Sequence, residues 1–350
     1  MTIKESLMHI DAAISRQNET CSAMPSPQFD DKNSFEIIQF WYSKKVNCQT
    51  TMTLLPLWFK GLTPELQHKA EVTLGETSHV KAKALVDFRR LINEQQDLYS
   101  RLDEVFLLRF LRTKKYDVQK AFKIFLNYYD LKSKQKGKFT GLKPSDVKKV
   151  IEMNNILYVP YRLPSGSHVA IYRMGTFDVN KATAQELVAT VFLLGEMILD
   201  CEATQVCGGV IIIDTAGITI QHYRQFATVQ FLSLVINLVQ DCLPERLKAI
   251  HFVNEPFTYH AIFHLIRPIL KKKLKDRLHF HGSDLSSLHR YVPKDFLPEE
   301  LGGNMGPFDN TEFANYFFSQ EAFIERINKY GKIEKCVSSP DKWKKKPLSL

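Results

Sequence analysis

The sequence predicts an α/β fold in which an all-helical region precedes a domain with a largely parallel sheet. Between residues 54 and 136, apolar residues recur at helical spacing. After Gly137–Gly141 ("GKFTG"), short apolar runs alternate with helical segments, and this alternation favours parallel strands joined by helices. The run from Gly208 to Gly217, "GGVIIIDTAG", is typical of a strand buried on both faces, because it is continuously apolar and ends in turn residues.

The helical region divides at its capping residues. Thr63-Pro64-Glu65 supplies an N-cap, a proline at the first helical position and early negative charge. Helical periodicity continues over Val80–Ile92 and Asp103–Arg112. A further helix is expected over Val118–Leu131, with Asp117 as its cap.

The second region begins with two strands, "ILYVPYR" and "HVAIYRMG", around the turn Pro164-Ser165-Gly166. A capping box at Thr183–Glu186 opens a long apolar helix that is predicted to run to about Ala203. Residues 221–241 have helical periodicity. Two more strands are expected, "KAIHFVNEP" after that helix and "LHFHG" further on.

Composition suggests an intracellular protein with an anionic partner. The formal net charge is +9, which favours binding to nucleic acid, phosphates or an acidic membrane surface. The first residues lack the basic head and apolar run of a secretory signal, and no apolar run reaches the roughly 18–20 residues that span a bilayer. The six cysteines form no CxxC pair, so reduced thiols and a cytoplasmic location are expected.

The two ends of the chain are expected to lie outside the folded domains. Residues 1–53 are polar, without sustained periodicity, and predict a disordered extension. Within them, "FEIIQFWY" is either a docking segment or a piece that packs on the main body. Residues 311–350 predict a C-terminal helix and a basic tail, whose end "KWKKKPLSL" either contacts a membrane or is solvated.

Candidate catalytic and metal sites are weak. Asp214 and Gly217 end the apolar strand, and the simplest interpretation is that Asp214 caps the following turn. Gly302, Gly303 and Gly306 follow a helix-like segment rather than a strand, so they do not predict a dinucleotide site. The sequence contains no GxxxxGK[ST] or GxSxG motif and no HExxH arrangement around its histidines. These patterns predict neither an enzyme nor a metal protein.

One stretch combines apolar and basic character. Phe257–Leu270 is apolar on more than one face and contains Pro268, which is expected to kink or end a helix. Lys271–Arg277 follows with five cations against Asp276. A net charge of four, at about 1 kcal/mol each, gives about 4 kcal/mol of attraction to an acidic membrane, an affinity near millimolar. The pattern therefore predicts transient contact with a membrane surface.

Several ordered motifs resemble those of the CRAL-TRIO family. "FLLRFLRTKKYDVQKAF" resembles its N-terminal helical region. "GGVIIIDTAG", "LPERLKAIHFVNEPFTYHAIFHLIRPIL", "RLHFHG" and "LPEELGG" resemble successive motifs of its lipid-binding domain. The resemblance covers about residues 54–310 and is strongest to the animal branch of α-tocopherol transfer protein, clavesin and cellular retinaldehyde-binding protein. It implies a helical region at 54–136 and a lipid-binding domain at 140–310.

The resemblance implies a hydrophobic cavity above the sheet, closed by a movable gate helix at the apolar stretch. The cavity would be lined by Val188, Val191, Phe192, Gly195, Ile213, Ile220, Val235, Leu238, Val239, Leu243 and Ile250. The gate would present Phe257, Ile262, Phe263, Ile266, Ile269 and Leu270. Ordinary core packing would produce the same residue types at all of these positions.

The resemblance also implies a basic cleft that binds phosphoinositide head groups beside the gate. The matching positions are all cationic: Lys114, Lys123, Arg246, Lys248, Lys273 and Arg277. Yeast-type phosphatidylinositol transfer relatives hold inositol phosphate inside the domain with a Glu, a cation and a small hydroxyl residue. Here Glu245 and Arg277 match, Lys114 replaces an Arg, and Leu274 stands at the hydroxyl position. Leu274 therefore favours a less polar cargo such as tocopherol, a retinoid or a sterol-like lipid.

The sequence thus predicts a non-enzymatic carrier with no cofactor beyond its bound lipid. The carrier would be cytoplasmic and would associate transiently with phosphoinositide-containing membranes, endosomes among them. The alternative is a phosphoinositide-binding adaptor in membrane trafficking that transfers no cargo. A nucleic-acid binder is disfavoured, because the basic residues accompany no recognisable nucleic-acid motif.

Overall fold

The computed structural model describes residues 54–333 except 258, 260–262 and 265. These residues fall in one compact unit. The predicted disordered extension, the "FEIIQFWY" segment and the basic tail lie outside the described residues. In the part of the chain that the structure covers, no helix is both long and apolar enough to cross a membrane.

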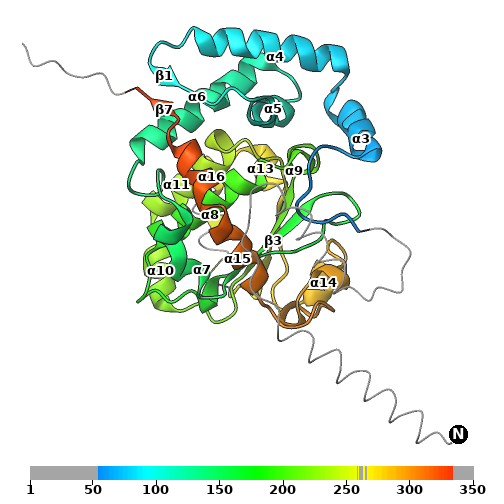
Figure 1. The fold of residues 1–350 in the computed structure, drawn as a ribbon. Coiled ribbons are helices and arrows are strands. Elements are labelled where there is room, and N and C mark those ends of the chain that lie inside the picture. The colour runs from blue at the N-terminus through cyan, green and yellow to red at the C-terminus, as the bar shows by residue number, and fades with distance from the viewer. Residues whose placement is uncertain (1–53, 258, 260–262, 265, 334–350) are drawn as a thin grey trace, which may run out of the picture. The chain divides into compact units, whose positions relative to one another are not determined.

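Four helices form the N-terminal region, as predicted (Figure 1). They are α3 (Pro64–Leu74), α4 (Ser78–Asn93), α5 (Glu104–Thr113) and α6 (Val118–Lys134). Each begins at a polar side chain that accepts a hydrogen bond from a backbone N–H in the first turn, and these caps are Thr63, Thr77, Asp103 and Asp117. Between α4, α5 and α6, an aromatic cluster of edge-to-face rings fills the core: Phe88, Phe106, Phe110, Phe125 and Tyr128.

A five-stranded sheet follows, in the order β2-β3-β4-β5-β6. Its strands are β2 (Ile156–Tyr158), β3 (His168–Arg173), β4 (Gly209–Asp214), β5 (Leu247–Val253) and β6 (Leu278–Phe280). β2 and β3 are antiparallel, and all other neighbours are parallel. Because parallel strands align their ends, residues that precede β5 and β6 lie at the same edge of the sheet.

Helices connect the strands, and two of them are shorter than the sequence predicts. The helix at the capping box, α8 (Ala184–Ile198), ends before Ala203, and a separate α9 covers Glu202–Cys207. The break places Asp200 where it bonds Arg101 and Arg109. The predicted helix over residues 221–241 is divided into α10 (Ile220–Phe226), α11 (Val229–Asn237) and a π-helical turn (Leu238–Cys242), because Thr228 starts a new helix by capping Phe231.

Shorter elements complete the chain. An antiparallel pair joins β1 (Leu98–Tyr99) to β7 (Gly331–Lys332). The other helices and helical turns are η1 (Pro144–Val147), α7 (Lys148–Ile151), η2 (Met174–Thr176), η4 (Arg267–Ile269), α13 (Lys272–Lys275), α14 (Leu285–His289), η5 (Lys294–Phe296), η6 (Glu299–Leu301), α15 (Thr311–Ser319) and α16 (Glu321–Asn328).

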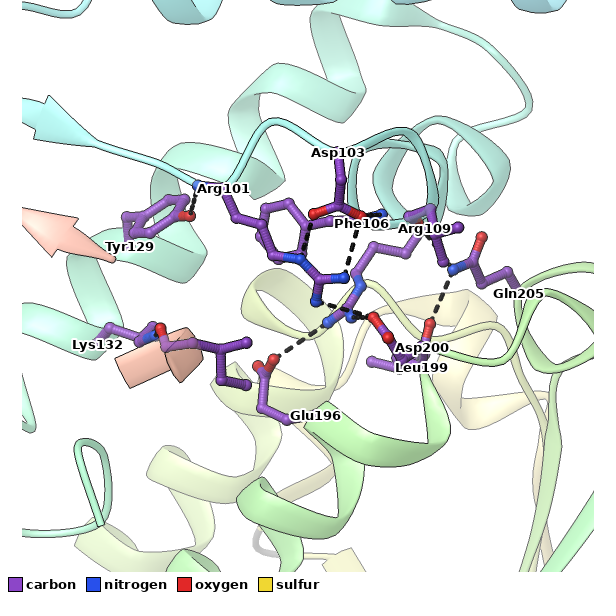
Figure 2. A network of polar contacts seen from close by, with 12 residues as sticks. Arg101, Asp103, Phe106, Arg109, Tyr129, Lys132, Glu196, Leu199, Asp200 and Gln205 are labelled. Atoms are coloured by element: carbon purple, nitrogen blue, oxygen red, sulfur yellow. Dashed lines mark hydrogen bonds and ion pairs between the residues drawn. The ribbon is translucent and has the colours of Figure 1, made fainter. Parts of the chain in front are cut away.

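Buried arginines link the helical region to the helices of the sheet domain (Figure 2). Arg109 of α5 is fully buried, 3.2 Å from Glu196 of α8 and 3.0 Å from Asp200. Arg101 also contacts Asp200, at 2.8 Å. One turn along α5, Arg112 bonds Glu76 and Gln205. A buried charge is stable only when it is paired, so these contacts fix α5 against α8 and α9.

Two predictions about strand β4 have different outcomes. Asp214 caps the following turn as expected, because its Oδ1 accepts a hydrogen bond from the Ala216 N–H at 3.0 Å and Gly217 has φ +79°. The prediction that the strand is buried on both faces is wrong for one face. Val210 and Ile212 are buried, but Ile211 and Ile213 on the opposite face are only half-buried. That opposite face belongs to the candidate site.

Candidate functional site

The candidate site begins with the apolar face of the sheet that carries Ile211 and Ile213. A compact cluster of buried side chains covers part of this face: Ile236, Leu247, Ile250, Leu270 and Leu274. They come from α11, from β5 and from the segment between β5 and β6. Alternation along the paired strands places Ile250 and Phe252 of β5 on the same face as Ile211 and Ile213 of β4.

Around this cluster, apolar side chains remain only partly buried. They are Ile211, Ile213, Val239, Phe252, Phe263, Ile266 and Leu278. Phe280 joins them, since its ring stacks on Phe252 and contacts Phe263, both with centroids 5.0 Å apart. Removing apolar surface from water stabilises a complex by about 25 cal/mol per Å². Binding of an apolar ligand to this surface would therefore be favourable.

Gly195 marks empty space next to α8. The residue is buried, yet a methyl group built at its Cα meets no other heavy atom within 4 Å beyond its own helix and its chain neighbours. Protein interiors are normally close-packed, and a buried glycine that faces open space is therefore an exception. Gly195 is one of the positions at which the family resemblance implies a cavity wall.

The other predicted cavity residues fall into three groups. Ile213, Val239 and Ile250 lie on the apolar face just described. Another five are buried or half-buried without being part of that cluster: Val188, Val191, Val235, Leu238 and Leu243. The remaining two, Phe192 and Ile220, depart from the expectation.

Ile220 and Phe192 do not have the surroundings expected of cavity residues. Ile220 is 67% exposed, because it is the first residue of α10 and extends from the helix into solvent. Assigning it to an enclosed cavity wall is therefore wrong. Phe192 packs on Tyr128 and Phe139, with centroids 6.3 and 6.0 Å away, so its ring contributes to the contact between α8 and the helical region.

The predicted gate residues also differ in their surroundings. Phe263 and Ile266 pack against the apolar cluster, and Leu270 is a buried member of it. Phe257 is 89% exposed and Ile269 is 50% exposed, which leaves two large apolar side chains at the surface beside the site. The segment ends in the 3₁₀ turn η4, which contains Pro268, as a helix-breaking proline predicts. Ile262 lies outside the described residues.

A basic cluster lies at the edge where β5 and β6 begin; we define it as Lys114, Arg246, Lys248, Lys273 and Arg277. Arg246 and Lys248 flank the first residue of β5, and Arg277 directly precedes β6. The Arg277 carbonyl accepts a hydrogen bond of 2.8 Å from Ile250 N–H, which ties the two strands together. Lys273 lies in α13, and Lys114 is the C-cap of α5.

Electrostatic interactions within the basic cluster show that its members lie close together. Burial lowers the pKa of Lys273, and the charges of Arg277, Lys114 and Arg246 lower it further. Burial likewise lowers the pKa of Lys248, with a further contribution from Arg246. Like charges in this arrangement repel one another, and a bound anion would relieve that repulsion.

The basic cluster has no carboxylate partner within the described residues, since none of its five members forms an ion pair there. In addition, Arg246 Nη1 is buried and finds no hydrogen-bond acceptor among residues 54–333 as the structure describes them. A buried guanidinium donor without an acceptor is costly, and phosphate oxygens are the acceptors that suit it best. The arrangement can therefore bind an anionic phosphate group.

Sequence reasoning and the structure differ over two further lysines. Lys123, which the resemblance includes in the cleft, is exposed on α6, and it is not among the charges that most lower the pKa of Lys248 or Lys273. Lys271, which belongs to the basic run, is not free, because it pairs with Asp241. Sequence spacing alone gives no sign of this pairing, since Asp241 lies in the π-helical turn after α11.

Two of the positions that would hold an inositol phosphate inside the domain, Glu245 and Leu274, have other surroundings. Glu245 Oε1 lies 3.5 Å from Nε2 of the buried His168. Leu274, at the position of the hydroxyl residue, is 9% exposed and belongs to the apolar cluster. The environment of Leu274 is therefore apolar.

Two family models match the chain, in the order of its helical and sheet regions. The family model described as "CRAL/TRIO, N-terminal domain" matches residues 66–127, and the model described as "CRAL/TRIO domain" matches residues 152–303. A solved structure titled "Crystal structure of Sfh5" covers 76% of this chain and 99% of its own, with 12% identity and a TM-score of 0.41.

Curated relatives match over most of their lengths. The "Alpha-tocopherol transfer protein-like" protein of Mus musculus is 34% identical over 274 residues, which is 78% of this chain and 80% of the relative. "Clavesin-2" of Rattus norvegicus is 30% identical over 268 residues, or 75% of this chain and 80% of the relative. With both family models matched in order and relatives at these identities, the chain belongs to the CRAL/TRIO family of lipid-binding proteins.

Proposed function

We propose that this protein is a lipid carrier that holds an apolar ligand against the sheet and docks on phosphoinositide-containing membranes through the basic cluster. Family membership supports the general class, since CRAL/TRIO proteins are generally lipid-binding and non-enzymatic. The tocopherol and clavesin names belong to the relatives. Tocopherol, a retinoid or a similar lipid is the proposed cargo class for this chain.

The observation that carries the proposal is the unfilled apolar interior. Gly195 is buried beside open space, and the sheet face with Ile211 and Ile213 is only partly covered. A protein without a ligand to accommodate normally closes such a gap, because unfilled space forfeits packing energy. Leu274 supports an apolar cargo rather than one with an inositol phosphate buried inside the domain, because a leucine offers no hydrogen bond.

The basic cluster supports membrane docking. Its cations adjoin the apolar segment with the exposed side chains of Phe257 and Ile269. Apolar side chains that enter the bilayer interface while neighbouring cations meet anionic head groups form a reversible membrane contact. In this proposal the gate opens at that contact, because its apolar residues then exchange one apolar environment for another.

The test is transfer of a fluorescent tocopherol or retinoid between vesicles with and without a phosphoinositide. The variant Arg246→Ala/Lys248→Ala/Lys273→Ala/Arg277→Ala is expected to lose the phosphoinositide enhancement of transfer while still binding cargo in solution. The control replaces four exposed cations elsewhere, Lys83, Lys138, Arg290 and Lys294, by Ala, and it removes the same charge. An enhancement that survives in the first variant, or is lost equally in both, would contradict docking through the basic cluster.

The alternative is a phosphoinositide-binding adaptor that carries no cargo. Native mass spectrometry and lipid extraction of the purified protein separate the two. A co-purified apolar lipid supports the carrier. Phosphoinositide-dependent vesicle binding without any bound lipid or measurable transfer supports the adaptor.

A further inference from the structure

Lys69 of α3 lies near the basic cluster, although it is distant in sequence and absent from the set that the family resemblance implies. Its Nζ donates a hydrogen bond to the backbone carbonyl of Ser165, in the turn between β2 and β3. That contact holds a half-buried lysine in place against the sheet domain. In the part of the chain that the structure covers, Lys69 forms no ion pair, so two of its three donors stay available.

The packing around Lys69 explains why it lies beside β5. α3 packs on α9, and a methyl group built at Gly166 would lie 3.2 Å from Leu66 of α3 and 2.6 Å from Cys207 of α9. Directly after Cys207, Gly208 approaches the backbone of Arg246 so closely that a Cβ there would lie 1.9 Å from its carbonyl oxygen. These contacts run from α3 through α9 to the first residues of β5.

The charges agree with this geometry. Lys69 is among the cations that lower the pKa of Lys248, after burial and Arg246. Together with the packing of α3 on α9, this interaction places Lys69 near Lys248. Lys123, by contrast, is exposed on α6.

We propose that Lys69, rather than Lys123, is the sixth cation of the membrane-docking site and binds a phosphate of the same lipid head group as Arg246 and Lys248. This inference rests on the proposed function, because it assumes that the basic cluster binds a phosphoinositide head group. It adds α3 to the docking surface and adds one more cation to those that would bind the head group. The ligand that fits is a membrane lipid whose head group carries more than one phosphate.

The discriminating experiment compares Lys69→Ala with Lys123→Ala in the full chain. Both variants remove one lysine charge from the helical region, so Lys123→Ala is the charge-matched control. Binding is measured by co-sedimentation with phosphatidylcholine vesicles that contain about 5% of an inositol lipid with either one or two additional phosphates on the ring. Circular dichroism melting checks that both variants are folded.

Lys69→Ala is expected to weaken binding to the doubly phosphorylated vesicles roughly 5-fold, the loss of about one charge-assisted hydrogen bond. Its binding to singly phosphorylated vesicles changes less, and Lys123→Ala binds both as the unmodified protein does. Wild-type binding from Lys69→Ala, or an equal loss in Lys123→Ala, overturns the assignment of Lys69. If the unmodified protein itself shows no dependence on the phosphoinositide, the proposed function has failed instead.

Discussion

At the scale of single residues, Gly195 is a buried helical position that is occupied by a residue unfavourable for both helix stability and close packing. Glycine in a helix interior costs about 0.5–1 kcal/mol relative to alanine, because its backbone loses more freedom on folding. Gly195 lies in the middle of α8, is buried, and faces open space. A small residue at this point leaves space beside α8 at the expense of stability.

Gly195→Ala is therefore expected to raise the free energy of unfolding by about 0.5–1 kcal/mol, measured by urea denaturation of the ligand-free protein. The larger Gly195→Leu is expected to reduce the lipid that the protein retains. Gly175→Ala is the matched control, because a Cβ there would lie 1.9 Å from the Ala216 carbonyl oxygen and should destabilise the fold. Destabilisation by Gly195→Ala would show that the space beside α8 is already filled.

At the scale of elements, strands β5 and β6 carry different chemistry on their two faces. Phe252 and Phe280 belong to the apolar face. On the opposite face, His251 stacks between His279 and His281 with centroids 4.9 and 5.2 Å away, and its Nδ1 lies 2.9 Å from Nε2 of His281. Tyr291 covers all three rings.

The histidine face makes the stability of these strands depend on pH. Burial, with His279 and His281, lowers the pKa of His251 from 6.5 to about 3. His251 is therefore neutral in the folded protein and must stay so, whereas the unfolded chain takes up a proton at this site below its pKa of 6.5. The contribution of neutral His251 to the free energy of unfolding is present above pH 6.5 and is lost as the pH falls towards 3.

Between pH 7 and pH 5, this residue alone is expected to lower the free energy of unfolding by about 2 kcal/mol. Urea midpoints at the two pH values measure the change. His251→Asn cannot titrate in this range, so its stability should fall by correspondingly less over the same interval, whatever its starting value. An identical pH slope in the variant and the unmodified protein would refute the assignment to His251.

At the scale of the whole molecule, the basic cluster joins parts that are remote in the chain. Lys114 belongs to the helical region, Arg246 and Lys248 begin a central strand, and Lys273 follows the apolar segment. Burial lowers the pKa of each lysine in the cluster, and repulsion from other cluster members adds to this effect for Lys248 and Lys273. An anion that binds only the assembled cluster therefore stabilises the complete fold.

Soluble inositol polyphosphate is expected to raise the thermal midpoint of the protein, because a ligand at 100 times its Kd stabilises the folded state by about 2.7 kcal/mol. The shift should shrink as salt is added, through screening. It should also shrink as the pH rises towards the lowered lysine pKa values, because the site then loses charge. Scanning calorimetry at two salt concentrations measures the effect, and a salt-independent shift would contradict binding through the basic cluster.

The sequence alone predicts most of the elements and the family. Capping residues such as Thr63, Asp103 and Asp117 locate helix starts, because a cap bonds only to its own first turn. The apolar strand β4 and the capping box of α8 are likewise local signals. Helix ends are harder to predict. α8 ends before Asp200, whose carboxylate pairs with Arg101 and Arg109 of the helical region, and no local sequence pattern indicates these long-range pairs.

The sequence by itself determined the order of helices and strands, the cationic character of the basic cluster and the apolar residue at Leu274, because these properties depend on residue type and near neighbours. Only the tertiary structure decided which side chains meet. It placed Ile220 in solvent and Phe192 against the helical region, although both are apolar residues on helices. It also brought Lys69 towards Lys248 while leaving Lys123 apart. The physical reason is that a long-range contact is fixed by the packing of whole elements, which spacing along the chain does not encode.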